Sequence, residues 1–169
     1  MFETIEIDID TRGVATLTLN RPDKHNALSA QMLAELTQAA RDLGADDVVR
    51  VVVLRGAGKS FCAGGDLGWM REQMQADSDT RAREAGKLAY MLQALNTLPK
   101  PLIGALHGNA FGGRGWDGIG LRCRDRCGSH KDGPDRDAPW YHSRHHWTLC
   151  AGAHGRRTGA ARVHVCSDI

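Results

Sequence analysis

The chain has 169 residues, of which 41% are hydrophobic and 25% are charged, and its formal net charge is +2. This length is sufficient for one domain with a buried core, and the composition is that of an ordinary soluble protein. No apolar run approaches membrane-spanning length, and the N-terminus lacks a signal-peptide pattern, which argues against a membrane protein. We therefore expect a cytoplasmic protein with reduced thiols.

The N-terminal part begins with a strand pattern and continues with a helix pattern. Residues 5–9 alternate isoleucine with acidic side chains, and residues 14–19 alternate Val or Thr with Ala or Leu. Two adjacent segments with this period of two predict a β-hairpin. Ser29 is a suitable N-cap for the helix that follows, because its hydroxyl can accept from a free backbone N–H. Leucines then recur at helical spacing, and Gly44 is expected to end this helix.

Two continuous apolar runs, at 51–54 and 102–106, predict buried strands, and we expect the first strand to extend over 48–54. Between them, residues from about 67 to 98 carry an apolar stripe at helical spacing, and we expect one long helical region there. Strands that alternate with helices indicate an α/β fold with parallel strand pairs.

A glycine-rich site follows each apolar run. The first spans Ser60–Leu67 with Gly64 and Gly65 at its centre, and the second spans Gly108–Gly113. Glycine after a strand allows backbone N–H groups to approach a ligand closely. Two such sites can direct two donors at one oxygen, which is how an oxyanion is stabilised; the alternative is a pair of tight turns without a ligand.

The sequences of these segments resemble the crotonase (enoyl-CoA hydratase/isomerase) superfamily. They are Phe-Cys-Ala-Gly-Gly-Asp-Leu at 61–67, Lys-Pro-Leu-Ile-Gly-Ala-Leu-His-Gly at 100–108 and Ala-Phe-Gly-Gly at 110–113. Leu-Asn-Arg-Pro-Asp-Lys-His-Asn-Ala-Leu at 19–28 is similar to the family's first CoA-contacting segment. The resemblance covers residues 1–113 and implies a crotonase-like α/β fold of ββα repeats, truncated after the second glycine site.

The resemblance also implies a mechanism in which an acyl-CoA thioester carbonyl becomes an enolate. The Gly65 and Gly113 N–H groups would form the oxyanion hole, each donor contributing roughly 2.7–4 kcal/mol. No separate cofactor is implied, since CoA is part of the substrate. Substrate contacts are expected along two segments, and the residues concerned are Lys24, Ala27, Ala63, Asp66 and Leu67.

Three of the residues in these motifs have plainer alternatives. Asp66 either contacts substrate or caps the helix that begins near Leu67. Lys24 is either a partner for a CoA phosphate or a solvated loop lysine. Cys62 has no neighbour in the sequence that would activate it as a nucleophile, and we expect a small buried residue.

The tail, residues 114–169, differs in composition from the first 113 residues. It holds 6 of the 8 His, 4 of the 5 Cys and 3 of the 4 Trp, with 10 Lys/Arg against 6 Asp/Glu. It shows no helical or strand period and few apolar residues, so we expect it to be poorly ordered. Our hypothesis is that the tail is the same gene in a shifted reading frame, since Trp116-Asp117 forces a glycine codon one base later.

In the shifted frame, the tail permits family-like phrases typical of methylglutaconyl-CoA hydratase, an enzyme of leucine breakdown. One family carboxylate position falls at Trp116, where the shifted frame gives glycine, and the other falls at Arg136, where it permits glutamate. In the chain as written, the Arg136 guanidinium cannot act as a base, and Arg114 would crowd the oxyanion hole. We therefore expect a lineage of enoyl-CoA hydratases but no hydratase activity, and we doubt the family's trimer or hexamer for this chain.

Two other functions fit parts of the sequence. An isomerase or another acyl-CoA enzyme would share the oxyanion hole. A non-enzymatic module would use the tail to bind Zn²⁺, although the spacing matches no tight zinc motif; its ligands would be Cys123, Cys127, His142, His145, His146 and Cys150. The basic tail is poor support for nucleic-acid binding, because no ordered basic face is predicted.

Overall fold

The computed structural model describes residues 2–110, 148–151 and 163–166. Its main sheet has six strands in the order β1-β2-β3-β5-β8-β7. The strands are β1 (Ile5–Ile9), β2 (Val14–Leu19), β3 (Val51–Gly56), β5 (Leu102–Leu106), β7 (Thr148–Ala151) and β8 (Val163–Cys166). A second, two-stranded sheet pairs β4 (Ser60–Cys62) with β6 (Asn109–Ala110).

The strand pairings confirm the predicted α/β fold. β1 and β2 form the expected antiparallel hairpin, while β2, β3 and β5 are parallel neighbours. From the tail, β8 runs parallel to β5 and pairs with β7. The rest of residues 114–169 lies outside the described residues, and the poor order expected there stays a prediction.

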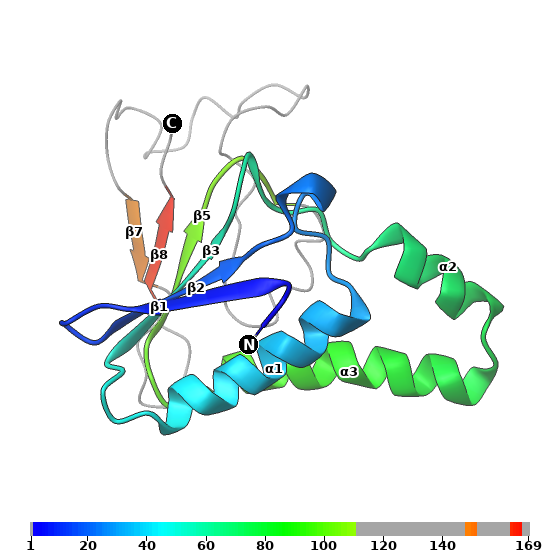
Figure 1. Cartoon of the computed structure of the whole chain (residues 1–169), viewed down its shortest axis with the longest axis horizontal. Helices are drawn as coiled ribbons and strands as arrows, with labels where there is room; N and C mark the ends of the chain where they lie inside the picture. Colours follow the sequence, from blue (N-terminus) through cyan, green and yellow to red (C-terminus); the bar gives the residue numbers. More distant parts are fainter. Residues whose placement is uncertain (1, 111–147, 152–162, 167–169) are drawn as a thin grey trace.

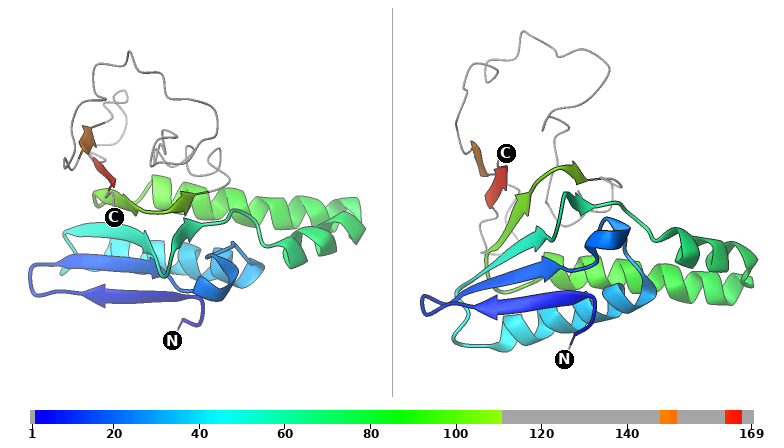
Figure 2. Two further views of the ribbon diagram at one scale, coloured as in Figure 1. Left: turned by 90° about the horizontal axis from the view of Figure 1, so that it is seen from above. Right: turned by 45° about the horizontal axis from the view of Figure 1, so that its top comes forward.

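Two helices cover one face of the sheet. Figure 1 shows α1 (Ala30–Ala45) and α3 (Ser78–Asn96) side by side on that face, and both views of Figure 2 agree. The core forms between them and the inward side chains of the central strands, with Leu17, Leu36 and Leu54 all fully buried. None of the described helices is long and apolar enough to cross a membrane.

Helix α1 begins as predicted but ends later. The Ser29 hydroxyl accepts from the Met32 N–H at 3.2 Å, which is the expected N-cap. Gly44 does not end the helix, because α1 continues to Ala45 and Asp46 is the C-cap. The reason for glycine is packing, since a Cβ at Gly44 would stand 3.1 Å from the Pro99 ring.

The predicted long helical region is two helices. α2 (Leu67–Gln75) ends at Ala76, and α3 begins afresh with Asp77 as its N-cap. α2 buries none of its side chains and extends beyond the end of the sheet (Figure 1). Its first turn lies beside the glycine-rich site, so that site has a helix N-terminus on one side.

Candidate functional site

The predicted site segments all begin at one edge of the main sheet. The carboxyl ends of β2, β3 and β5 meet there because the three strands are parallel. Residues 20–28 leave β2 at this edge, β4 follows β3, and Gly108 follows β5. Ligands of open α/β sheets bind outside the carboxyl ends of the strands, so this edge is where a site is expected.

Residues 20–28 reverse direction just after β2. Pro22–Lys24 forms a short 3-10 helix with proline in its first turn, where the fixed φ of proline suits a helix start. His25 and Asn26 follow with φ of 50° and 56°, a left-handed conformation that asparagine tolerates better than most residues. The reversal brings residues 27–28 back towards the end of β4.

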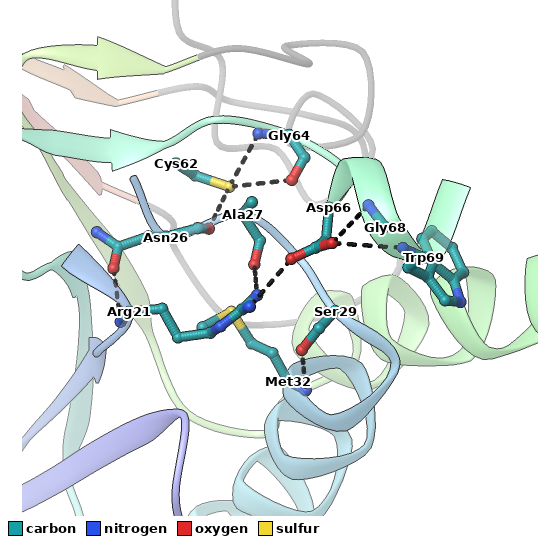
Figure 3. Close-up of polar contacts among 10 residues, drawn as sticks. All are labelled: Arg21, Asn26, Ala27, Ser29, Met32, Cys62, Gly64, Asp66, Gly68 and Trp69. Atoms are coloured by element: carbon teal, nitrogen blue, oxygen red, sulfur yellow. Dashed lines mark hydrogen bonds and ion pairs between the residues drawn. The ribbon is translucent and has the colours of Figure 1, made fainter. Parts of the chain in front are cut away.

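The buried side chain of Asn26 fastens this turn to the chain between β3 and β4. Its Oδ1 accepts from the Arg21 N–H at 2.9 Å, and its Nδ2 donates to the carbonyls of Ala57 and Ser60, both at 2.8 Å. Its own carbonyl accepts from the Cys62 thiol at 3.1 Å (Figure 3). Asn26 is 0% exposed, so its side chain cannot exchange these hydrogen bonds for bonds to water.

The glycine loop, residues Cys62–Asp66, runs alongside Leu28. The Leu28 N–H donates to the Gly64 carbonyl at 2.7 Å, and the Leu28 carbonyl accepts from the Asp66 N–H at 2.9 Å. A trans peptide places C=O and N–H on opposite sides, so the Gly65 N–H points away from Leu28. It has no acceptor among the described residues. The loop therefore presents one backbone donor, the Gly65 N–H, from a peptide unit that Leu28 holds in place through the Gly64 carbonyl.

The β4–β6 pairing brings the second glycine site towards the first. Ser60 pairs with Asn109 and Cys62 with Ala110, so the start of the second site lies alongside the strand that leads into the glycine loop. This arrangement agrees with two glycine sites that serve one ligand atom. Gly113, the expected second donor, lies outside the described residues.

Asp66 caps α2 and pairs with an arginine. Its Oδ1 accepts from the N–H groups of Gly68 at 2.9 Å and Trp69 at 3.3 Å. Its Oδ2 lies 3.0 Å from Nη2 of Arg21 (Figure 3). Partial burial raises the pKa of Asp66, but the hydrogen bonds from Arg21 and from the two helix N–H groups outweigh burial and hold that pKa below its ordinary value.

We expect this carboxylate to make stability depend on pH. A group whose pKa is lowered on folding adds stability above its unfolded pKa, near 3.9 for aspartate, and loses that contribution as the pH falls through the folded value. D66N should therefore flatten the fall of the unfolding free energy below about pH 5, measured by urea unfolding. D77N is the matched control, because Asp77 caps α3 and hydrogen bonds from Thr80 also lower its pKa, but it has no arginine partner among the described residues, so D77N should flatten this fall less. An equal flattening by D77N would contradict the role of Arg21.

A methionine of α2 lies beside the Gly65 donor. A Cβ at Gly65 would stand 3.2 Å from the Sδ of Met70, so the thioether borders the glycine directly. Leu67, Met70 and Met74 are 72%, 47% and 77% exposed and share one face of α2. The face of α2 that carries this neighbour of Gly65 is therefore apolar and exposed.

The structure places the other predicted contact residues near this loop. Lys24 is exposed at the end of the 3-10 helix, and its ammonium has no partner among the described residues. The Ala27 N–H donates to the Lys24 carbonyl, and the Ala27 carbonyl accepts from Arg21, so one of that carbonyl's two lone pairs is already used. The Ala63 N–H donates to the His25 carbonyl at 2.8 Å.

Several predictions fall on residues that the structure does not describe. Arg136, at the position of the family glutamate, is one of them, as are Arg114 and Trp116. The zinc hypothesis begins with Cys123 and Cys127, which are also outside the described ranges. Within those ranges, no group of three His, Cys, Asp or Glu side chains is placed to hold a metal ion.

Sequence reasoning missed three residues that shape the site, namely Arg21, Asn26 and Met70. Asn26 carries a weak signal, because asparagine favours the left-handed turn between Pro22 and the next helix. Arg21 and Met70 carry none, since their partners are 45 and 5 residues away and only the fold shows that they meet.

Comparison with known proteins agrees with this geometry. Residues 10–121, more than half of the chain, match the family model described as Enoyl-CoA hydratase/isomerase. A solved enoyl-CoA hydratase of Mycobacterium smegmatis is 42% identical with a TM-score of 0.59, over 63% of this chain and 40% of that one. A solved enoyl-CoA hydratase of Shewanella pealeana is 33% identical with a TM-score of 0.61, over 63% of this chain and 40% of that one.

A mouse relative, the mitochondrial Delta(3,5)-Delta(2,4)-dienoyl-CoA isomerase, is 35% identical over 120 residues, which are 66% of this chain and 37% of that protein. The chain thus spans less than half the length of these relatives. The family match, the parallel strands and the glycine loop together place the chain within the enoyl-CoA hydratase/isomerase family, to which it belongs.

Proposed function

We propose that the chain binds an acyl-CoA thioester with its carbonyl oxygen on the Gly65 N–H. The observation that supports this most directly is the direction of that N–H, which points away from Leu28 and has no acceptor among the described residues. An oxyanion hole needs such a donor already in place before the substrate arrives. Gly113 would supply the second donor, and residues 24–28 would lie beside the nucleotide part of CoA.

The reaction we favour is the addition of water to an α,β-unsaturated acyl-CoA, with methylglutaconyl-CoA as the substrate of the lineage. This choice depends on the similarity of the shifted-frame tail to that hydratase. Hydration needs a carboxylate that handles the protons of water. Asp66 is unsuited to this role, since Arg21 and the α2 N–H groups already occupy its two oxygens.

An isomerase is the second candidate, and a specific observation supports it. The mouse relative named as a dienoyl-CoA isomerase is 35% identical, which lies between the 33% and 42% of the two hydratase structures. Both reactions stabilise an enolate on a thioester and differ in the carboxylates that move protons. The described residues of the site supply one oxyanion donor, which both reactions need. They do not supply a free carboxylate that would distinguish a hydratase from an isomerase.

For the chain as written, we propose weak thioester binding in the cytoplasm without hydratase turnover, because Arg136 replaces the needed carboxylate. Calorimetry with acetyl-CoA and with S-ethyl-CoA, which has the same size but no carbonyl oxygen, isolates the contact with Gly65. We expect acetyl-CoA to bind severalfold more tightly than S-ethyl-CoA. In a separate hydration assay, we expect the absorbance of crotonyl-CoA to stay constant, because its double bond is not hydrated. Equal affinities would refute the oxyanion role, while hydration of crotonyl-CoA would refute the loss of activity.

A further inference from the structure

Arg21 connects the two segments of the site. Its Nη1 donates to the Ala27 carbonyl at 2.7 Å, and its Nη2 pairs with Oδ2 of Asp66 at 3.0 Å (Figure 3). Its backbone is held as well, because its N–H donates to Asn26 Oδ1 and its carbonyl accepts from the N–H groups of Lys24 and Asn26. The side chains of Arg21 and Asp66 are only 21% and 19% exposed, so their ion pair is largely shielded from water.

The partner of Arg21 is the residue next to the proposed oxyanion donor. The Asp66 N–H is fixed to Leu28, and its Oδ1 is fixed to the start of α2. Oδ2 is held by Arg21, the one ion pair that this carboxylate makes with a described residue. Asp66 can therefore turn only if Arg21 releases it, and the peptide units on both sides of Gly65 would move with it.

We propose that Arg21 is a positioning residue, which sets the direction of the Gly65 N–H by holding the Ala27 carbonyl and the Asp66 carboxylate at a fixed separation. The effect of Arg21 on the direction of this N–H does not depend on the proposed function. Its consequence, the alignment of the donor with a thioester oxygen, rests on the proposed function. The role suits the planar fork of arginine, whose two terminal nitrogens reach two acceptors at once. A lysine ammonium retains the charge but is a single point.

The first test needs no ligand and compares R21K and R21Q with R12Q by NMR. Arg12 forms the matched control pair, since it binds Asp10 at 2.6 Å in the exposed hairpin, away from the site. We expect both Arg21 variants to shift the Gly65 amide signal and to accelerate hydrogen exchange at Gly68 at least tenfold, with α1 and α3 unchanged. R12Q should leave these signals in place. An unchanged Gly65 signal in R21K would overturn the proposal, and so would shifts spread evenly over α1 and α3.

A second test uses the unaltered chain, in case both variants unfold. Protonating Asp66 removes the ion pair, so the Arg21 side-chain signals and the Gly65 amide should titrate with a common midpoint in acid. Separate midpoints would overturn the link between them.

The functional consequence is tested with the same pair of ligands as before. R21K should reduce the preference for acetyl-CoA over S-ethyl-CoA severalfold, because acetyl-CoA loses both the Gly65 contact and any contact disturbed near Ala27, whereas S-ethyl-CoA loses only the latter. A parallel loss for both ligands would indicate a general structural role and would contradict positioning. If the unaltered chain already fails to distinguish the two ligands, the proposed function fails, while the ligand-free tests still decide the role of Arg21.

Discussion

Replacing Asn26 with alanine should reduce the unfolding free energy by about 2 kcal/mol or more, since it takes the Asn26 partner from three backbone groups and a group that stays buried and unpaired costs about 1–3 kcal/mol. These groups are the Arg21 N–H and the carbonyls of Ala57 and Ser60. Alanine also lacks the local hydrogen bonds that help asparagine adopt φ of 56°. Urea unfolding followed by circular dichroism measures the loss.

The control for this variant is N20A. Asn20 donates to Glu6 in an exposed bond, and a change of this kind is usually within about 0.5 kcal/mol. A similar loss for N26A and N20A would contradict the view that Asn26 fastens residues 20–28 to the chain after β3.

The isosteric change N26D separates hydrogen bonding from packing. Aspartate has nearly the same shape, but a carboxylate oxygen would replace the Nδ2 that donates to Ala57 and Ser60. An ionised carboxylate has no donor for these carbonyls, so we expect N26D to destabilise at least as much as N26A above pH 5. A stable N26D protein would indicate that the volume of the side chain matters more than its two donors.

The second large effect is expected from G108A. Gly108 has φ of +55°, which costs a residue with a Cβ roughly 1–2 kcal/mol. A Cβ there would also overlap the Lys59 carbonyl oxygen, a backbone atom that cannot rotate away. Relief requires β4 and β6 to separate, which would break the 3.1 Å bond from the Phe61 N–H to the His107 carbonyl. We expect a loss of about 2–4 kcal/mol in urea unfolding, with the glycine loop displaced.

G86A is the control for the second prediction and should have the opposite sign. Gly86 lies within α3, where a Cβ would meet only the Tyr90 ring at 3.6 Å, an ordinary contact. Alanine in a helix is favoured over glycine by roughly 0.8–1 kcal/mol, so G86A should stabilise the chain slightly. If G108A were as well tolerated as G86A, the close approach of Gly108 to Lys59 would be wrong.

The sequence alone predicted the elements whose signals are local. The hairpin, the Ser29 cap and the buried parallel strands follow from side-chain period and from capping chemistry, and the structure confirms them. The break between α2 and α3 also has a local signal that was missed. Asp77 is a good N-cap, and its Oδ1 accepts from the Thr80 N–H at 2.7 Å, which begins a new helix.

Long-range contacts explain what the sequence did not predict. β4 has three residues and β6 has two, and they exist because residues 48 and 49 positions apart pair with each other, which no sequence period reveals. The role of Gly44 is likewise decided by Pro99, far along the chain. At the site, the glycine motif indicated Gly65, but the direction of its N–H depends on Leu28, and the link to Arg21 depends on the turn at Asn26.

The measurement that tests the central claim most directly is the NMR signal of the Gly65 amide proton during titration with acetyl-CoA and, separately, with S-ethyl-CoA. A hydrogen bond to the thioester oxygen should shift this signal downfield with acetyl-CoA and leave it nearly in place with S-ethyl-CoA, while signals near Lys24 respond to both. An equal response of Gly65 to both ligands, or no response to either at millimolar concentration, would contradict the oxyanion role of this residue.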